Sequence, residues 1–461
     1  MEILVKAGQL LLALSILVTL HELGHYWAAR LFKIRVDRFY LFFDFLFPLP
    51  NVLKFSVFKK KIGDTEWGLG WFPMGGYVQI AGMMDENMDK DTLAQPAKPD
   101  EFRSKPAWQR LIVMIGGVTV NLILGMLIYS MILFVWGEKY LPNSAAKYGI
   151  VADSLGQKIG LRSGDHITAI DGKTVENFND IIPTIGMDES KNLTVKRGDS
   201  TFNLAVPKGF IGQLSKSKGE GFIGVRYKFV IEKFSGGASS FASTAGFKEG
   251  DEVIGINDST PIFVNDVIAY LATHKTKETV FNVKHKDGKI EPIKFIIPET
   301  GKLGVGLGSP LDQFEFKIKQ YSIISCIPAG ITKSFEMLNG YMKGLNQLFR
   351  SLFGKSEVKA SDSVGGFISI GNLFPNQWHW EIFWNITAVL SLILAIMNLL
   401  PIPALDGGHV IFCLYEMLTG RKPHEKVLEY AQYVGMALLL GLMIYVNGND
   451  IYKFIIVKFL H

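Results

Sequence analysis

Long runs without any charged residue limit the folds open to this chain more than any other feature. Residues 111–136, 382–405 and 431–449 contain no Asp, Glu, Lys or Arg. Each run is long enough to cross a hydrocarbon layer of ~30 Å as an α-helix that rises about 1.5 Å per residue. A fourth run, residues 7–20, is shorter but continues into HELGHYWAA before the first arginine. The sequence therefore predicts four transmembrane helices.

Residues 7–20 also resemble the apolar part of a signal peptide. That alternative needs a basic start and a cleavage site of small residues, whereas the chain starts Met-Glu-Ile-Leu-Val-Lys, with one Glu against one Lys. The polar residues that end the run would also have no purpose in a segment that is removed. We favour an uncleaved first helix.

Basic residues indicate the orientation of the spans, because Lys and Arg concentrate in cytoplasmic loops. They follow the first span, precede the second, and separate the third from the fourth: Arg30, Lys33, Arg35 and Arg38; Arg103, Lys105 and Arg110; Arg421, Lys422 and Lys426. We expect these connections in the cytoplasm and residues 137–380 on the opposite face. In a bacterium this predicts a multi-pass protein of the cytoplasmic (inner) membrane, with the long segment on the periplasmic or external side.

The composition narrows the choice of partners. With 48% hydrophobic and 20% charged residues over 461 positions, the chain is too long for one ordinary soluble domain and rather apolar for several. Its formal charge is only +5 and no Lys/Arg run forms a basic stripe, so we expect a lipid bilayer and no nucleic acid as partner. Cys326 and Cys413 lie far apart and predict neither a disulfide nor a thiolate metal site, only two buried small side chains.

The segment between the second and third runs contains an internal repeat. Residues 160–171 and 246–257 share the pattern G-[LF]-x-x-G-D-x-[IV]-x-x-[IV]-[DN], and the match continues at Asn179-Asp180 and Asn265-Asp266. The pattern predicts a turn, a strand that alternates apolar and polar residues, and a second turn. It resembles the core of a PDZ domain, a fold that often captures an extended peptide at a sheet edge. Two copies of some other small β-rich domain are the alternative.

Two further segments carry weaker patterns. Residues 39–82 are aromatic and Gly-rich, and Trp67, Leu69 and Trp71 alternate before Gly75-Gly-Tyr-Val78, which predicts strands. Such a sheet could enter the bilayer only where protein or water satisfies its backbone; an ordinary cytoplasmic hairpin is the alternative. Residues 320–352 place apolar side chains at helical spacing, which fits an amphipathic helix on the membrane surface or a plain packed helix equally well.

The sequence His21-Glu22-Leu-Gly-His25 ends the first apolar run. It is an H-E-x-x-H motif, and on a helix the two histidines lie one turn apart on the same face, where both can bind one metal ion. Zinc suits such ligands, and Glu22 could then act as the base that takes a proton from water. Ionisable residues inside a membrane usually serve a function. The alternative is a chance match to the motif that binds no metal, with polar residues that reach the lipid headgroups.

A catalytic zinc needs a third protein ligand, and Asp406 is our candidate. It follows the third run in Asn398-Leu-Leu-Pro-Ile-Pro-Ala-Leu-Asp406-Gly-Gly. The two prolines should break the helix and let Asp406 turn towards the first helix, and the glycines allow a close bend. His409 is the rival ligand, followed by Glu416. Asn398 could orient substrate or stabilise an oxyanion, or could make a hydrogen bond between helices.

These motifs resemble, in their order along nearly the whole chain, the site-2 protease family of intramembrane zinc metalloproteases, and within it the bacterial RseP-like branch with tandem PDZ domains. The pairing of HELGH with N-x-x-P-x-P-x-L-D-G in two apolar segments is the most specific part. The resemblance implies one zinc ion per chain on His21, His25 and Asp406, with Glu22 as the catalytic residue. One departure is Gly116-Gly117 where relatives often carry Gly-Pro before Asn121, and we expect it to leave the site untouched.

The resemblance also implies a fold and a substrate class. It implies a polytopic α-helical membrane protein with four transmembrane helices, a membrane-reentrant β-loop that pairs with extended substrate, and two inserted β-rich PDZ-like domains. Gly75, Gly76, Tyr77, Val78 and Asn398 are the candidate substrate-binding residues. Relatives cut single-span membrane proteins already trimmed by another protease, typically anti-sigma factors, and remnant signal peptides. An inactive scaffold and a transporter are the alternatives; the intact motif residues disfavour the first, and four spans without an inverted repeat disfavour the second.

The expected division of the chain follows these features in order. It comprises the first transmembrane helix with the HExxH motif (1–30), a cytoplasmic or membrane-reentrant β-region (31–105), the second transmembrane helix (106–137), two PDZ-like domains (138–228 and 229–312), an amphipathic periplasmic segment (313–380), the third transmembrane helix with the LDG motif (381–408), and a cytoplasmic connection with the fourth transmembrane helix (409–461).

Overall fold

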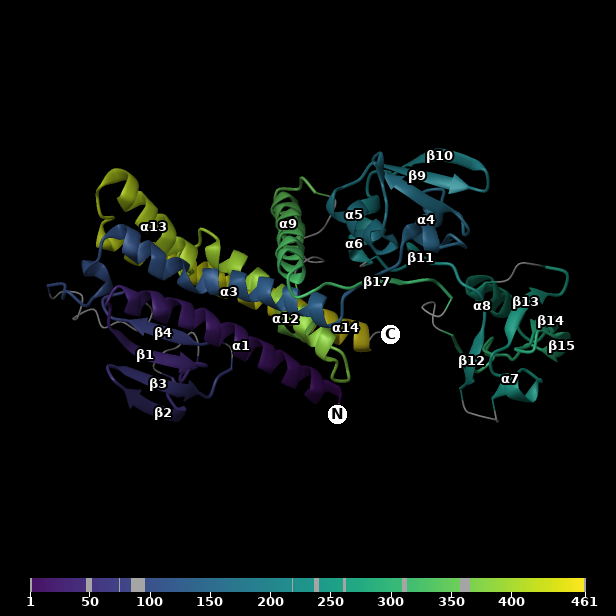
Figure 1. Ribbon diagram of the computed structural model, residues 1–461, viewed down its shortest axis with the longest axis horizontal. Coiled ribbons are helices and arrows are strands. Elements are labelled where there is room, and N and C mark those ends of the chain that lie inside the picture. Colours follow the sequence, from purple (N-terminus) through teal and green to yellow (C-terminus); the bar gives the residue numbers. More distant parts are fainter. Residues whose placement is uncertain are drawn as a thin grey trace. The chain divides into compact units, whose positions relative to one another are not determined.

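A computed structural model of the chain describes residues 2–46, 52–73, 75–83, 96–217, 219–235, 240–259, 263–308, 313–356 and 365–459. The chain divides into two compact units (Figure 1). The first unit comprises Met1–Gly137, Gln320–Leu345 and Val364–His461, and the second comprises Glu138–Lys319 and Asn346–Ser363.

Helices dominate the first unit. They are α1 (Glu2–Leu31), η1 (Phe102–Ser104), α3 (Ala107–Val135), α9 (Cys326–Leu352, which continues into the second unit), α11 (Phe367–Gly371), α12 (Trp380–Leu399), α13 (Asp406–Thr419) and α14 (Glu425–Phe459). Among the described residues, four helices are long and apolar enough to cross a membrane: α1, α3, α12 and Lys426–Tyr452 of α14. These are the four helices that the uncharged runs predict.

Three of these helices, α1, α3 and α12, pack side by side (Figure 1). Small residues allow α1 and α3 to touch: a Cβ atom on Gly24 would lie 2.4 Å from the carbonyl oxygen of Gly116. Between α3 and α12, Ser391 Oγ donates a hydrogen bond to the carbonyl oxygen of Asn121 (2.7 Å). Close backbone approach and interhelical hydrogen bonds are the usual means of holding helices together in lipid.

The segment after α12 breaks as its prolines predict. Pro401 disfavours helix at Leu400, whose ψ of 144° is extended, and α12 ends at Leu399. A new helix, α13, begins at Asp406. The cytoplasmic connection that the sequence predicts to begin at residue 409 therefore begins within a helix. Ala404 has a φ of +88°, a strained value for a residue with a side chain. The short non-helical segment thus carries a sharp turn directly before Asp406.

A four-stranded sheet follows α1 in the order β2-β3-β1-β4. Its strands are β1 (Val36–Leu41), β2 (Ser56–Ile62), β3 (Thr65–Gly70) and β4 (Tyr77–Ile80), so the region that the sequence predicts to contain strands does contain them. β1 pairs with β3 in parallel and with β4 in antiparallel fashion. β4 is an edge strand and lies against α1. β4 pairs with β1 on one side, and no strand from the described part of the chain pairs with it on the other side.

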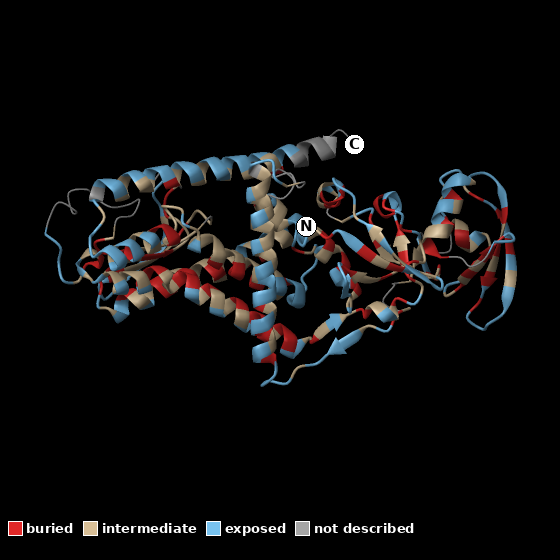
Figure 2. Cartoon of the chain, turned by 90° about the horizontal axis from the view of Figure 1, so that it is seen from above, coloured by how far each residue is buried: buried red, intermediate tan, exposed pale blue. Residues whose placement is uncertain are grey.

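The last helix, α14, is mostly exposed: only 6% of its most apolar window is buried, and it is pale along most of its length in Figure 2. Its buried anchor is Asp450, which accepts hydrogen bonds from the backbone N–H groups of Gly366 (2.9 Å) and Ser369 (2.8 Å) at the start of α11. Exposure of apolar side chains is expected of a helix that faces lipid.

The second unit is built from short strands and helices. They are β5 (Glu138–Tyr140), η2 (Asn143–Ala145), β6 (Ile150–Ala152), α4 (Ser154–Lys158), β7 (His166–Ile170), β8 (Lys173–Thr174), η3 (Phe178–Asp180), α5 (Ile181–Met187), β9 (Asn192–Arg197), β10 (Ser200–Ala205), α6 (Phe210–Lys216), β11 (Ile223–Val225), β12 (Ile231–Phe234), α7 (Phe241–Thr244), β13 (Glu252–Ile256), α8 (Val264–Thr273), β14 (Glu278–Lys284), β15 (Ile290–Ile296), β16 (Val305–Leu307) and β17 (Lys317–Lys319). The sheets are β10-β9-β7-β8, β13-β14-β15, β11-β6, β12-β16 and β17-β5.

The sequence repeat is a structural repeat as well. Its two copies form β7 and β13, each within its own hydrophobic core. The buried aspartate before each strand pairs with a basic side chain at the end of the neighbouring strand: Asp165 with Arg197 (2.7 Å) and Asp251 with His285 (2.6 Å). The turns after the two strands begin at positive φ, at Asp171 (+46°) and Asn257 (+50°). The turn, strand and turn of the sequence pattern are therefore present in both copies.

Candidate metal centre

The two histidines of the HExxH motif lie on the face of α1 that packs against α3. His21 and His25 are 7% and 4% exposed. Because α1 stays helical through Leu31, their rings lie one turn apart, and their Nε2 atoms approach to 3.3 Å. Two imidazoles buried this closely among apolar helices need a shared partner.

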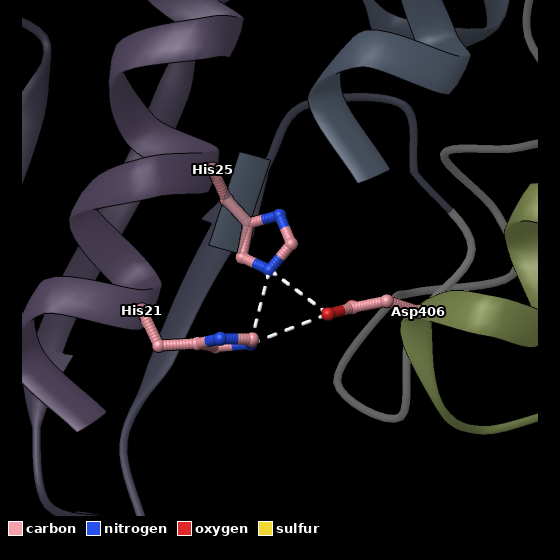
Figure 3. Close-up of side chains that lie close together, drawn as sticks. All are labelled: His21, His25 and Asp406. Atoms are coloured by element: carbon pink, nitrogen blue, oxygen red, sulfur yellow. Dashed lines mark hydrogen bonds and ion pairs between the residues drawn. The ribbon is translucent and has the colours of Figure 1, made fainter. Parts of the chain in front are cut away.

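That partner comes from a distant part of the chain, the first turn of α13. Asp406 Oδ2 lies 3.2 Å from His21 Nε2 and 3.2 Å from His25 Nε2, so the three side chains converge on one point (Figure 3). Within the described residues, they form the one group of three or more His, Cys, Asp or Glu side chains that could hold a metal ion.

The geometry of the three ligand atoms fits a small divalent cation. Zinc bonds to imidazole nitrogen and carboxylate oxygen measure about 2.0–2.2 Å, so tetrahedral ligands should lie about 3.3 Å apart. The three separations are 3.2, 3.2 and 3.3 Å. Asp406 Oδ2 is also a buried atom that accepts no hydrogen bond from the described residues, as expected of an oxygen whose partner is a metal.

The rival ligands lie elsewhere. Glu416 forms a mostly buried ion pair with Arg110, which links α13 to α3. His409, one turn after Asp406, lines the adjacent cavity but is outside the three-residue group. Among the candidates that the sequence offered, Asp406 is the one that the fold brings to the histidines.

Helix α3 supports both histidines through one face. His25 Nδ1 donates a hydrogen bond to the carbonyl oxygen of Val113 (2.8 Å), and His21 Nδ1 lies 3.2 Å from the amide of Asn121. Gly117 lies between them, and a Cβ atom there would be 2.5 Å from His25 Nε2. The expectation that the Gly116-Gly117 to Asn121 segment leaves the site untouched was therefore wrong. The spacing of these α3 residues was the signal that sequence reasoning missed. Positions 113, 117 and 121 repeat every four residues, as 21 and 25 do, so each set lies on one face of its helix.

A cavity of about 220 Å³ adjoins the three side chains. Glu22, half-buried, lines it together with Gly76, Tyr77 and Val78, which bring edge strand β4 to the site. Gly75 is not part of the lining, and its position instead contacts the ring of Phe43. The cavity therefore offers a carboxylate and an edge strand beside the three candidate ligands.

Asn398, near the end of α12, also reaches the centre. Its side-chain nitrogen lies 3.1 Å from His21 Nε2. This position, on the metal-facing nitrogen of the ring, places the Asn398 amide beside any ligand or substrate atom that occupies the centre. The contact joins α12 to α1, so it also fits the helix-to-helix hydrogen bond that the sequence left open.

Comparison with known proteins identifies the family. The model of peptidase family M50 matches residues 9–442, which is most of the chain. The chain belongs to peptidase family M50. This confirms the resemblance to site-2 proteases, and the M50 protein is accordingly an enzyme, a metalloprotease.

Similar proteins align over nearly their whole lengths. The regulator of sigma E protease of Haemophilus influenzae is 26% identical, with 98% of this chain and 99% of the relative covered. Metalloprotease MmpA of Caulobacter vibrioides is 26% identical, with 99% and 98% covered. A Xylella fastidiosa protein named as a candidate zinc metalloprotease is 27% identical, with 98% and 99% covered.

Proposed function

We propose that His21, His25 and Asp406 hold one zinc ion and that Glu22 is the catalytic base of an intramembrane endopeptidase. The observation that carries the proposal is the triangle of ligand atoms, whose sides of 3.2, 3.2 and 3.3 Å match the edge of a zinc tetrahedron. Zinc is the cofactor that the names of the relatives give. The cavity beside these three side chains would admit water and substrate to the ion.

Zinc supplies a Lewis acid that polarises a peptide carbonyl and acidifies water. The protein's own groups do the rest. Glu22 lines the cavity next to the histidines and takes a proton from the attacking water, then passes a proton to the leaving amine. Asn398 donates its amide N–H towards the oxygen of the polarised carbonyl, where negative charge develops.

The substrate reaches this centre as an extended chain. A transmembrane helix hides its carbonyl groups in hydrogen bonds to residues four positions along, so it has to unwind before water can attack. The free edge of β4 can pair with the unwound segment, as an added strand, and Tyr77 and Val78 then place it along the cavity. Gly76 allows β4 to lie close to Tyr40 and Val18, because a Cβ atom there would be 2.6 Å from the Tyr40 carbonyl oxygen, and Gly75 packs on the ring of Phe43.

The substrate class follows from the membrane setting and from one relative's name. Helices α1, α3 and α12, which carry residues of the centre, are long and apolar enough to cross a membrane, which fits single-span membrane proteins as substrates. The Haemophilus relative is named regulator of sigma E protease. We assign the protein to regulated intramembrane proteolysis of pre-trimmed substrates such as an anti-sigma factor or a remnant signal peptide. The two repeat copies of the second unit act as PDZ-like domains on the periplasmic side of the inner membrane and exclude substrates with bulky outer domains.

A cleavage assay on a labelled single-span substrate tests the proposal. Purified Glu22→Gln should retain zinc and lose activity by ~100-fold or more, because the amide cannot take a proton. Asp64→Asn makes the same chemical change in the exposed turn between β2 and β3 and should cleave like the wild type. Equal cleavage by Glu22→Gln and wild type would remove Glu22 from the mechanism, and wild-type protein without zinc would defeat the metal site.

A further inference from the structure

The stripe Val113–Gly117–Asn121 on α3 mirrors the spacing of the two histidines on α1. Helices α1 and α3 run in opposite directions, so Val113 contacts His25 and Asn121 contacts His21. Gly117, between them, leaves room for both rings, since a Cβ atom there would lie within 2.7 Å of each. One face of α3 therefore contacts both rings, at Nδ1 through Val113 and Asn121 and along the gap between the rings through Gly117.

The contacts of Val113 and Asn121 differ in whether the partner atom can only accept a hydrogen bond from the ring or can also donate one. Val113 presents a carbonyl oxygen, which can only accept, so His25 Nδ1 carries a proton and its Nε2 lone pair faces Asp406. Asn121 presents an amide, which can accept through Oδ1 or donate through Nδ2. In the structure Nδ2 faces His21 Nδ1 at 3.2 Å, and Oδ1 is buried with no hydrogen-bond partner among the described residues.

A histidine that gives Nε2 to a cation carries its proton on Nδ1, and a partner that accepts this proton fixes the ring. Rotation of the Asn121 amide by half a turn places the partnerless Oδ1 opposite His21 Nδ1, and the two amide atoms are nearly interchangeable in shape. Asn121 itself is fully buried, so its amide stays opposite the ring in either orientation.

Building on the proposed zinc site, we propose that Asn121 is a positioning residue that selects the metal-binding tautomer of His21. Its amide accepts the Nδ1 proton when zinc occupies Nε2 and donates to Nδ1 when the proton resides on Nε2. The amide thereby serves both states of the ring, whereas the Val113 carbonyl holds His25 permanently in the metal-binding tautomer. Of the two histidines, His21 is therefore the one whose metal-binding tautomer depends on a side chain, that of Asn121.

Zinc affinity of the full-length protein in detergent, measured by competition with a chromophoric chelator, tests this role. Asn121→Leu has a similar size but no acceptor and should weaken zinc binding by about 10- to 100-fold. Asn121→Asp can only accept and should bind zinc at least as tightly as the wild type. Ser391→Ala removes the hydrogen bond to the Asn121 backbone and keeps the amide, so it should retain wild-type affinity.

The order of affinities separates the explanations. If Asn121 served helix packing alone, Asn121→Leu would bind zinc like the wild type, which would overturn the inference. If Asn121 acted as a donor, Asn121→Asp would lose zinc as Asn121→Leu does, which would also overturn it. A wild-type protein without zinc would instead defeat the proposed metal site, so the two failures are distinguishable.

Discussion

Substitution of Gly117 by alanine should disrupt the metal centre although all three proposed ligands stay in the chain. The added Cβ would lie 2.5 Å from His25 Nε2 and 2.6 Å from His21 Cε1, and Cβ atoms essentially never approach closer than 3.0 Å. The two rings or the α3 backbone that faces them must therefore shift, by about 0.5 Å at His25, whereas zinc sites tolerate deviations of about 0.2 Å in ligand distance. Since both rings belong to the site, neither can move away freely.

We expect Gly117→Ala to lower zinc affinity by about tenfold or more, with a matching loss of cleavage. Gly125→Ala is the matched control, because it lies two turns along the same helix and its Cβ would meet the Leu392 side chain at a similar 2.6 Å. The control should disturb the packing of α3 on α12 and retain zinc, because its contact lies outside the metal centre. Chelator competition and thermal unfolding of both variants measure the two effects. Wild-type zinc affinity in Gly117→Ala would refute the geometry of the centre.

Two further predictions concern other parts of the chain. Asp406→Ala should abolish stoichiometric zinc, whereas His409→Ala, one turn along α13, should retain it in the same metal analysis; the reverse result would exchange their roles. In the second unit, the hydrogen bond that His285 donates to Asp251 raises the pKa of His285 above its ordinary 6.5. The pair therefore stabilises the fold fully below about pH 6.5 and loses that contribution as pH rises through the raised pKa. Hydrogen exchange in β14 should therefore distinguish His285→Gln from wild type at about pH 6 more than at about pH 9, and an equal difference at both would contradict this.

The sequence determined those features that depend on local composition and spacing. Uncharged runs long enough to span a bilayer predicted the four apolar helices, and alternation around Trp67 and Leu69 predicted the sheet that contains β3. Pro401 and Pro403 predicted the end of α12, because proline restricts its neighbour whatever the fold around it. The HExxH spacing placed His21 and His25 on one helical face, since i and i+4 positions always coincide there.

Tertiary structure alone decided which distant groups meet these residues. Asp406 and His409 both follow α12 within a few residues, and only the turn at Ala404 and the start of α13 show which of them reaches the histidines. Asn121 looked remote from the site, yet the close approach of α1 and α3 at Gly24 brings its amide to His21. The physical reason is that spacing along one helix fixes a face, whereas the packing of two helices fixes which faces touch.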